Sequence, residues 1–191
     1  MKSMKLTSAL TVAMIAGGIG FSSISADAAP QNQNSTGKVT FTAGALTLDA
    51  VPTLDFGDQA ITTADQVYNA KSESVATVTD LRGSSAGWNL TVKQETQLKT
   101  AQSEELQGAQ LKLASGTLET ESNDTATVSN GTLTPTVALK VLDASAGQGN
   151  GTFSAKWATT GATLDVPGAT TKLAKAYTAD LTWTLTDAPA S

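Results

Sequence analysis

From Lys38 onward the chain consists of short runs in which apolar and polar residues alternate. The longest run covers residues 177–185, where one parity is apolar and the other is Thr or Asp. Shorter runs carry the apolar residues Val39 and Phe41, Leu46 and Leu48, Leu111 and Leu113, and Phe153, Ala155 and Trp157. Because successive side chains of a strand point to opposite faces, each run predicts a strand with one buried face. Turn residues separate the runs, which favours an all-β, mostly antiparallel β-sandwich or barrel-like domain.

Two segments between the runs carry predictions of their own. Asn130-Gly131 can supply the two positive-φ residues of a type I′ turn, which predicts a hairpin between residues 125–128 and 133–139. Residues 94–108 do not alternate and are rich in Gln, Glu, Lys and Leu. This composition predicts a polar loop or a short helix.

The first 28 residues have the pattern of a secretion signal. Lys2 and Lys5 precede an apolar stretch, and Ala26-Asp27-Ala28 presents small residues where signal peptidase cleaves. We predict cleavage after Ala28, followed by a flexible polar lead-in over 29–37 and one β domain over 38–191. A retained membrane helix is the weaker interpretation because three glycines interrupt the apolar stretch. No later stretch approaches about 18 apolar residues, so we expect no transmembrane anchor after cleavage.

Composition narrows the chemistry that the chain can perform. It contains no Cys and no His, so cysteine or histidine nucleophile–base pairs and zinc–thiolate sites are excluded. The formal net charge of -5 argues against nucleic acid as a partner, because phosphate-backbone binders need clustered Lys and Arg. We expect no cofactor.

Two segments contain the tripeptide Trp-x-Leu. The first is Asp80-x-Arg82-Gly-x-x-x-Gly-Trp88-x-Leu90, in which a glycine-containing turn leads into a predicted strand. The second is the C-terminal run Tyr177-x-x-x-Leu-x-Trp-x-Leu-x-x-x-Pro189. Together with the secretion signal, these motifs resemble the WxL domain of Gram-positive surface proteins over nearly the whole chain after cleavage.

The resemblance implies a non-catalytic, secreted protein attached non-covalently to the cell wall or cell surface. Peptidoglycan is the ligand proposed for the family, and WxL-interacting surface proteins are its partners. Gram-positive walls carry anionic polymers, so an acidic chain gains nothing from bulk attraction to them. Attachment should therefore rest on specific contacts, and a partner that itself holds the wall is favoured over direct peptidoglycan binding by this chain.

The candidate binding residues follow from the two motifs. They are Asp80, Arg82, Trp88, Leu90, Tyr177, Leu181, Trp183 and Leu185. Two interpretations stay open for the Trp residues: packing in the core, which is favoured, or lining an exposed groove or edge strand. Trp157 has the same ambiguity. Arg82 is expected to pair with Asp80 and fix the turn, although its guanidinium would also suit a carboxylate of a ligand.

Two rival functions rest on carboxylates. A peptidoglycan hydrolase would need two of them in one cleft, and the candidates are Glu104, Glu105, Glu119, Glu121 and Asp124. A calcium site would use Asp49, Asp55 and Asp58, which lack the compact spacing of a calcium loop. Solvated surface carboxylates and turn caps are the simpler interpretations, and we expect neither catalysis nor a metal site.

Overall fold

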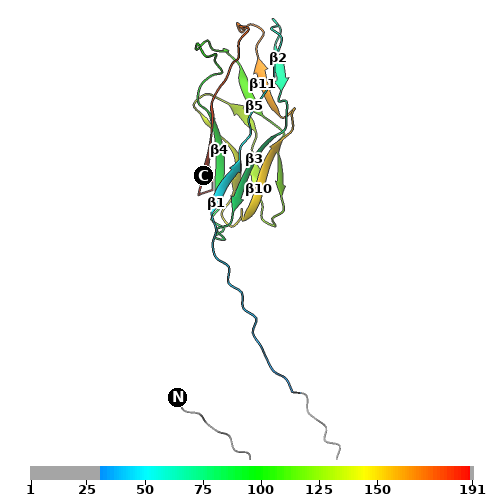
Figure 1. Ribbon diagram of the computed structural model, residues 1–191, viewed down its shortest axis with the longest axis vertical. Coiled ribbons are helices and arrows are strands. Elements are labelled where there is room, and N and C mark those ends of the chain that lie inside the picture. Colours follow the sequence, from blue (N-terminus) through cyan, green and yellow to red (C-terminus); the bar gives the residue numbers. More distant parts are fainter. Residues whose placement is uncertain (1–30, 190–191) are drawn as a thin grey trace, which may run out of the picture. The chain divides into compact units, whose positions relative to one another are not determined.

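The computed structural model describes residues 31–189, so the predicted signal peptide, 1–28, lies outside the described residues. The chain divides into two units, residues 1–40 and 41–191, and all strands belong to the second. The strands are β1 (Leu46–Ala50), β2 (Gln66–Asn69), β3 (Ser74–Asp80), β4 (Trp88–Gln94), β5 (Gln110–Leu113), β6 (Thr117–Thr120), β7 (Thr127–Val128), β8 (Gly131–Leu133), β9 (Ala138–Ala144), β10 (Gly151–Trp157), β11 (Ala162–Val166) and β12 (Leu181–Thr186) (Figure 1). Residues 31–189 contain no helix, and therefore none that could span a membrane.

Three four-stranded sheets make up the domain, with orders β1-β3-β10-β6, β2-β11-β5-β8 and β12-β4-β9-β7. All the pairings between these strands are antiparallel. The predicted all-β, antiparallel fold is therefore confirmed. β2, β5 and β11 lie at one end of the domain, and β1, β3, β4 and β10 lie toward the other (Figure 1).

A continuous ribbon joins two of the sheets. β3 pairs with β10 from Asp80 opposite Gly151 onward, and β2 pairs with β11 as far as Gln66 opposite Val166. Between the two pairings, the Ala70 amide donates to the Ala162 carbonyl at 2.9 Å. The same two stretches of chain thus run side by side through both ends of the domain, which fixes one end relative to the other.

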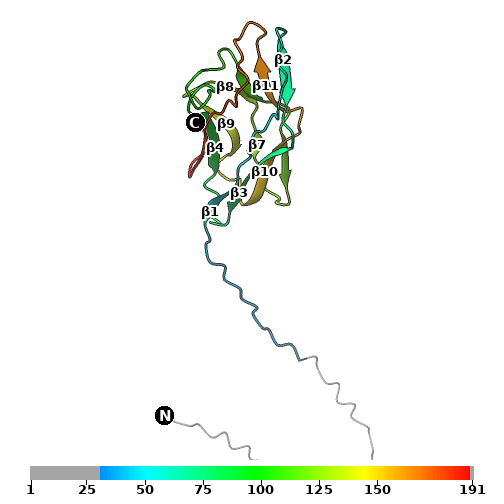
Figure 2. The ribbon, with the colours of Figure 1, turned by 45° about the horizontal axis from the view of Figure 1, so that its top comes forward.

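The core takes buried residues from all three sheets. In one part of it, the sheet of β3 and β10 faces the sheet of β4 and β9 (Figure 2). Every second residue of β3 and β4 is buried, as strand alternation requires. Trp88 of β4 contacts Phe153 of β10 across this interface, with ring centroids 5.7 Å apart at a 56° tilt. Trp157 is also fully buried, so its core interpretation is confirmed.

The hairpin predicted at Asn130-Gly131 is wrong. β7 pairs with β9 and β8 pairs with β5, so the two strands flanking the dipeptide belong to different sheets. Leu133 of β8 lies opposite Leu111 of β5 and is buried in the core. The Asn130 side chain instead accepts a hydrogen bond from the Gly116 amide at 2.9 Å.

Two strand predictions need correction and one loop prediction is confirmed. The strand expected at Val39 and Phe41 does not form, and these side chains are 73% and 88% exposed. The last strand is shorter than predicted, because residues 177–180 precede β12 and only Thr178 makes a bridge, with Lys99. Residues 94–108 contain no helix after β4 ends and form a loop whose Leu side chains are buried.

Candidate functional site: the groove beside the last strand

The fold places the two Trp-x-Leu tripeptides on neighbouring strands. β4 begins with Trp88, and β12 carries Trp183 and Leu185. In the antiparallel register Leu185 lies opposite Leu90, and Trp183 lies opposite Val92. The motifs are far apart in the sequence, yet they form one apolar surface on one side of a strand pair.

The two strands differ in burial. Trp88 and Leu90 on β4 are fully buried, and the Trp88 indole donates to the Gly149 carbonyl at 3.0 Å. Leu181, Trp183 and Leu185 are only partly buried, because β12 lies at the edge of its sheet and pairs with β4 alone. The core interpretation is thus confirmed for Trp88, whereas Trp183 keeps part of its surface in contact with solvent.

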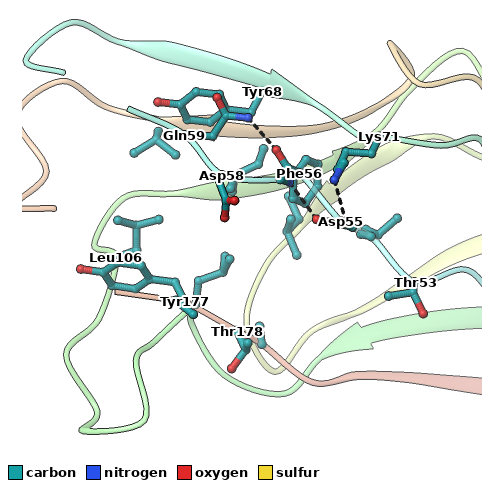
Figure 3. A pocket seen from close by; sticks show the side chains of 18 of the residues that line it. Thr53, Asp55, Phe56, Asp58, Gln59, Tyr68, Lys71, Leu106, Tyr177 and Thr178 are labelled. Atoms are coloured by element: carbon teal, nitrogen blue, oxygen red, sulfur yellow. Dashed lines mark hydrogen bonds and ion pairs between the residues drawn. The ribbon is translucent and has the colours of Figure 1, made fainter. Parts of the chain in front are cut away.

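A cavity of about 1300 Å³ opens beside β12, and we call it the groove. Residues 51–61 and 172–181 line it from two sides, and side chains of the sheet of β2, β5 and β11 and of the loop 94–108 also contribute to its lining (Figure 3). Of the predicted binding residues, Tyr177, Leu181 and Trp183 lie in this lining. The other five do not.

Polar groups accompany the apolar lining of the groove. The Asp55 carboxylate accepts from the Gly57 amide at 2.8 Å and lies 3.8 Å from the Lys71 ammonium (Figure 3). Gln59 donates to the Phe56 carbonyl at 2.6 Å. Asp55 and Lys71 are both more than 60% exposed, so charges of both signs border an aromatic and aliphatic surface. Such a surface can bind a ligand with apolar and polar parts.

A family model described as "WxL domain surface cell wall-binding" matches residues 5–189. The chain belongs to the WxL domain family. It is therefore a cell-surface, cell wall-binding protein. Searches of curated proteins and of solved structures find no match.

Arg82 of this WxL domain ties the two motif strands together. Its Nε and Nη2 atoms donate to the two Asp80 carboxylate oxygens at 2.9 and 2.8 Å, and Nη2 also reaches the Gly87 carbonyl at 3.0 Å. Its Nη1 donates to Asp187, which follows β12. We call Asp80, Arg82, Gly87 and Asp187 the Arg82 cluster. The expected ion pair between Arg82 and Asp80 is confirmed.

The position of Gly87 in the Arg82 cluster requires a glycine, for reasons of both backbone conformation and space. Its φ is +79°, and a Cβ added there would lie 2.6 Å from the Ala144 carbonyl oxygen. The glycine before Trp88 in the WxL motif therefore lets the turn pass close to the end of β9 while its own carbonyl faces Arg82. The turn at Gly87, and with it the start of β4, is therefore held by Arg82 on one side and by the end of β9 on the other.

The Arg82 cluster predicts a specific acid sensitivity. Hydrogen bonds from Arg82 lower the pKa of the buried Asp80 carboxyl below its usual 3.8, against the opposing effect of burial. Because the folded state then binds fewer protons than the unfolded state, this stabilisation is complete only at pH values well above 3.8, begins to decline as the pH approaches 3.8, and is lost as the pH falls through the lowered pKa. Urea midpoints of the wild type should fall below about pH 5, and Asp80→Asn should fall less steeply.

Asp49→Asn is the control for this pH series. The Thr79 hydroxyl lowers the pKa of Asp49, but this residue is exposed, so its substitution should change the slope of stability against pH only slightly. Equal slopes for wild type and Asp80→Asn would show that the Arg82 cluster does not govern acid unfolding.

The carboxylates considered for catalysis or calcium binding have other partners or lie at the surface. Glu104 pairs with Lys175 at 2.7 Å, Glu119 lies 3.4 Å from Lys156, and Asp124 accepts from Asn150. Glu105 and Glu121 are exposed. Within residues 31–189, no three His, Cys, Asp or Glu residues form a group that could hold a metal ion. The WxL family is a binding family, and its description names no reaction.

Sequence reasoning missed most of the lining of the groove. Phe56 and the rest of residues 51–61, Tyr68 of β2, and Leu173 contribute to its lining, and none of them belongs to a Trp-x-Leu motif. The apolar residues Leu54 and Phe56 share a parity, which gave only a weak signal of a buried face. Their position beside β12 depends on the long-range pairing of the sheets.

Proposed function

We propose that this WxL protein is held on the cell wall through a complex with a wall-anchoring partner, a WxL-interacting surface protein, and that the partner binds in the groove. The observation that carries this proposal is the position of Tyr177, Leu181 and Trp183 in a solvent-accessible groove beside an edge strand. The family assignment supports attachment to the cell wall, and the groove offers a surface to which a protein partner can bind.

The lining of the groove favours a protein as its occupant. Val51, Ile61 and Leu173 line it and are each at least 37% exposed, so apolar area there is available to a partner. Partner-binding surfaces typically combine an aromatic and aliphatic centre with a polar rim, and the Asp55–Lys71 pair supplies charges of both signs. A bulk electrostatic attraction to an anionic wall is excluded by the net charge of -5.

Direct binding of peptidoglycan by this chain is the alternative. Tyr68 and Tyr177 both line the groove (Figure 3), and a tyrosine can combine ring contacts with hydrogen bonds to a polar ligand. The Tyr177 hydroxyl is already engaged, because it accepts a hydrogen bond from the Leu173 amide at 2.9 Å. This bond holds the loop before β12 in shape and leaves the ring face for contacts.

The groove is tested by Leu173→Asp, with Val137→Asp as its matched control. Both Leu173 and Val137 are exposed, but only Leu173 lines the groove. A charge in the apolar lining of the groove should weaken retention on walls that carry the partner by roughly tenfold or more, whereas Val137→Asp should bind like the wild type. Binding is measured by co-sedimentation over a concentration series.

Protein-free sacculi separate the two forms of attachment. If the wild type sediments with purified, protein-free sacculi as well as it does with walls carrying the partner, the chain binds peptidoglycan directly and the proposed partner is not needed for attachment. Equal retention of Leu173→Asp and Val137→Asp on partner-bearing walls would overturn the assignment of the groove.

A further inference from the structure

β12 has one free edge. It is the terminal strand of the sheet β12-β4-β9-β7, and within the described residues it pairs with β4 alone. Its exposed parity is Thr182, Thr184 and Thr186, and its other parity contacts the core. An unpaired strand edge presents a row of backbone donors and acceptors to which a further strand can add.

The same chain contains a strand-like segment without a partner. Residues 38–42, Lys-Val-Thr-Phe-Thr, alternate apolar and polar side chains but form no strand. Phe41 is 88% exposed and Val39 is 73% exposed, the two highest values among the large hydrophobic residues described as exposed. An aromatic side chain left almost wholly in water gains free energy from any docked position that buries it.

We propose that residues 38–42 of one copy add as a strand to the free edge of β12 in a second copy. The segment has five residues and β12 has six, so the two are similar in length. Val39 and Phe41 share one parity and would extend the apolar row of Leu181, Trp183 and Leu185, with Thr40 and Thr42 beside the Thr residues of β12. The wall protein would thereby self-associate through a segment that precedes its domain.

Chain direction favours a second copy over the same chain as the donor. β12 ends at the Arg82 cluster, as the bond from Arg82 to Asp187 shows. β1 starts at that end, because Leu46 lies opposite Asp80, and it runs away from it. A segment that turned tightly into β1 of its own chain would therefore lie parallel to β12. A second copy can present the segment antiparallel, which is the more stable pairing.

This self-association goes beyond the proposed function, since it needs neither the wall nor a partner. The first experiment therefore uses the purified chain alone. The protein has no cysteine, so Thr40→Cys and Thr184→Cys can each be introduced as a single thiol. An equimolar mixture of the two variants under mild oxidation should give a disulfide-linked heterodimer. Thr40→Cys mixed with Thr132→Cys, an exposed position on the edge strand β8, is the control and should give little.

The cross-linking results decide between the donors. A heterodimer no more abundant with Thr184→Cys than with Thr132→Cys would overturn the proposal. A cross-link that forms only within monomers of the double variant Thr40→Cys/Thr184→Cys would also overturn it, because the segment would then dock on its own chain.

A sedimentation series measures the contribution of the apolar face. The double variant Val39→Asp/Phe41→Asp should raise the dissociation constant of the dimer at least roughly tenfold, whereas Thr40→Asp, on the opposite face, should raise it less. These residues lie outside the strands, so neither variant should change the urea midpoint of the domain. A wild type that stays monomeric at every concentration would contradict the proposal.

Discussion

Replacing Trp88 with Ala should lower the free energy of unfolding by about 3–5 kcal/mol, the largest effect expected of any single truncation in this protein. The side chain is fully buried, its ring contacts Phe153 across the two sheets, and its indole donates to the Gly149 carbonyl at 3.0 Å. Truncation leaves a cavity between the sheets and an unpaired buried carbonyl. Domains of this size are typically stable by only about 5–15 kcal/mol, so the variant should unfold far more easily.

Urea unfolding followed by far-UV circular dichroism measures the effect of Trp88→Ala. Trp183→Ala is the matched control: Trp183 is only partly buried on an edge strand, so its truncation should cost clearly less. Trp88→Phe, which keeps most of the volume but loses the hydrogen bond, should lie between the wild type and Trp88→Ala. Equal losses for Trp88→Ala and Trp183→Ala would contradict the difference in burial.

The same variants separate packing from binding. Trp88 lies outside the lining of the groove, whereas Trp183 lies within it. Under conditions where each variant is folded, Trp88→Ala should keep its retention on walls and Trp183→Ala should lose it. Retention lost by a fully folded Trp88→Ala would point to a role for Trp88 in binding that its burial does not suggest.

Arg82→Ala should cost about 3 kcal/mol, the lower end of the range for breaking a buried ion pair. The Asp80 side chain is fully buried and Arg82 keeps 16% exposure, so the substitution leaves a carboxylate without its main partner in the interior. It also removes the bonds to Gly87 and to Asp187, which hold the turn before β4 and the end of β12. Thermal and urea unfolding at pH 7 measure the loss.

Lys71→Ala is the control for Arg82→Ala. Lys71 also pairs with an aspartate, Asp55, at 3.8 Å, but both of these side chains are more than 60% exposed. An exposed pair typically contributes about 0–1 kcal/mol, so this variant should stay close to the wild type. If the two variants lost similar stability, the Arg82 cluster would be no more than a surface ion pair.

Local patterns predicted the parts of the structure that depend on neighbouring residues. Alternation identified β10, where Phe153 and Trp157 are buried, and the face of β4 that begins with Trp88. The spacing Asp80-x-Arg82 predicted an ion pair, and a turn in the chain is enough to bring these two side chains together. These predictions were correct because parity and short-range reach are set by backbone geometry.

The failed predictions concern the choice of partner. Asn130-Gly131 has suitable turn chemistry, but its flanking strands pair in two different sheets instead of with each other. Residues 38–42 alternate well and still form no strand in the single chain. Tyr177 continues the apolar parity of β12 but precedes the strand, in the lining of the groove. A strand requires hydrogen bonds to another strand, and its own residues do not specify which one.

The sequence by itself determined the fold class, the family motifs, the buried parity of the central strands and the pairing of Arg82 with Asp80. Only the tertiary structure decided that two similar Trp-x-Leu tripeptides have different surroundings. β4 lies between two strands and buries Trp88 completely, whereas β12 has a neighbour on one side and leaves part of Trp183 in the groove. Burial depends on what packs against a residue, and strand order within a sheet arises from contacts between segments far apart in the chain.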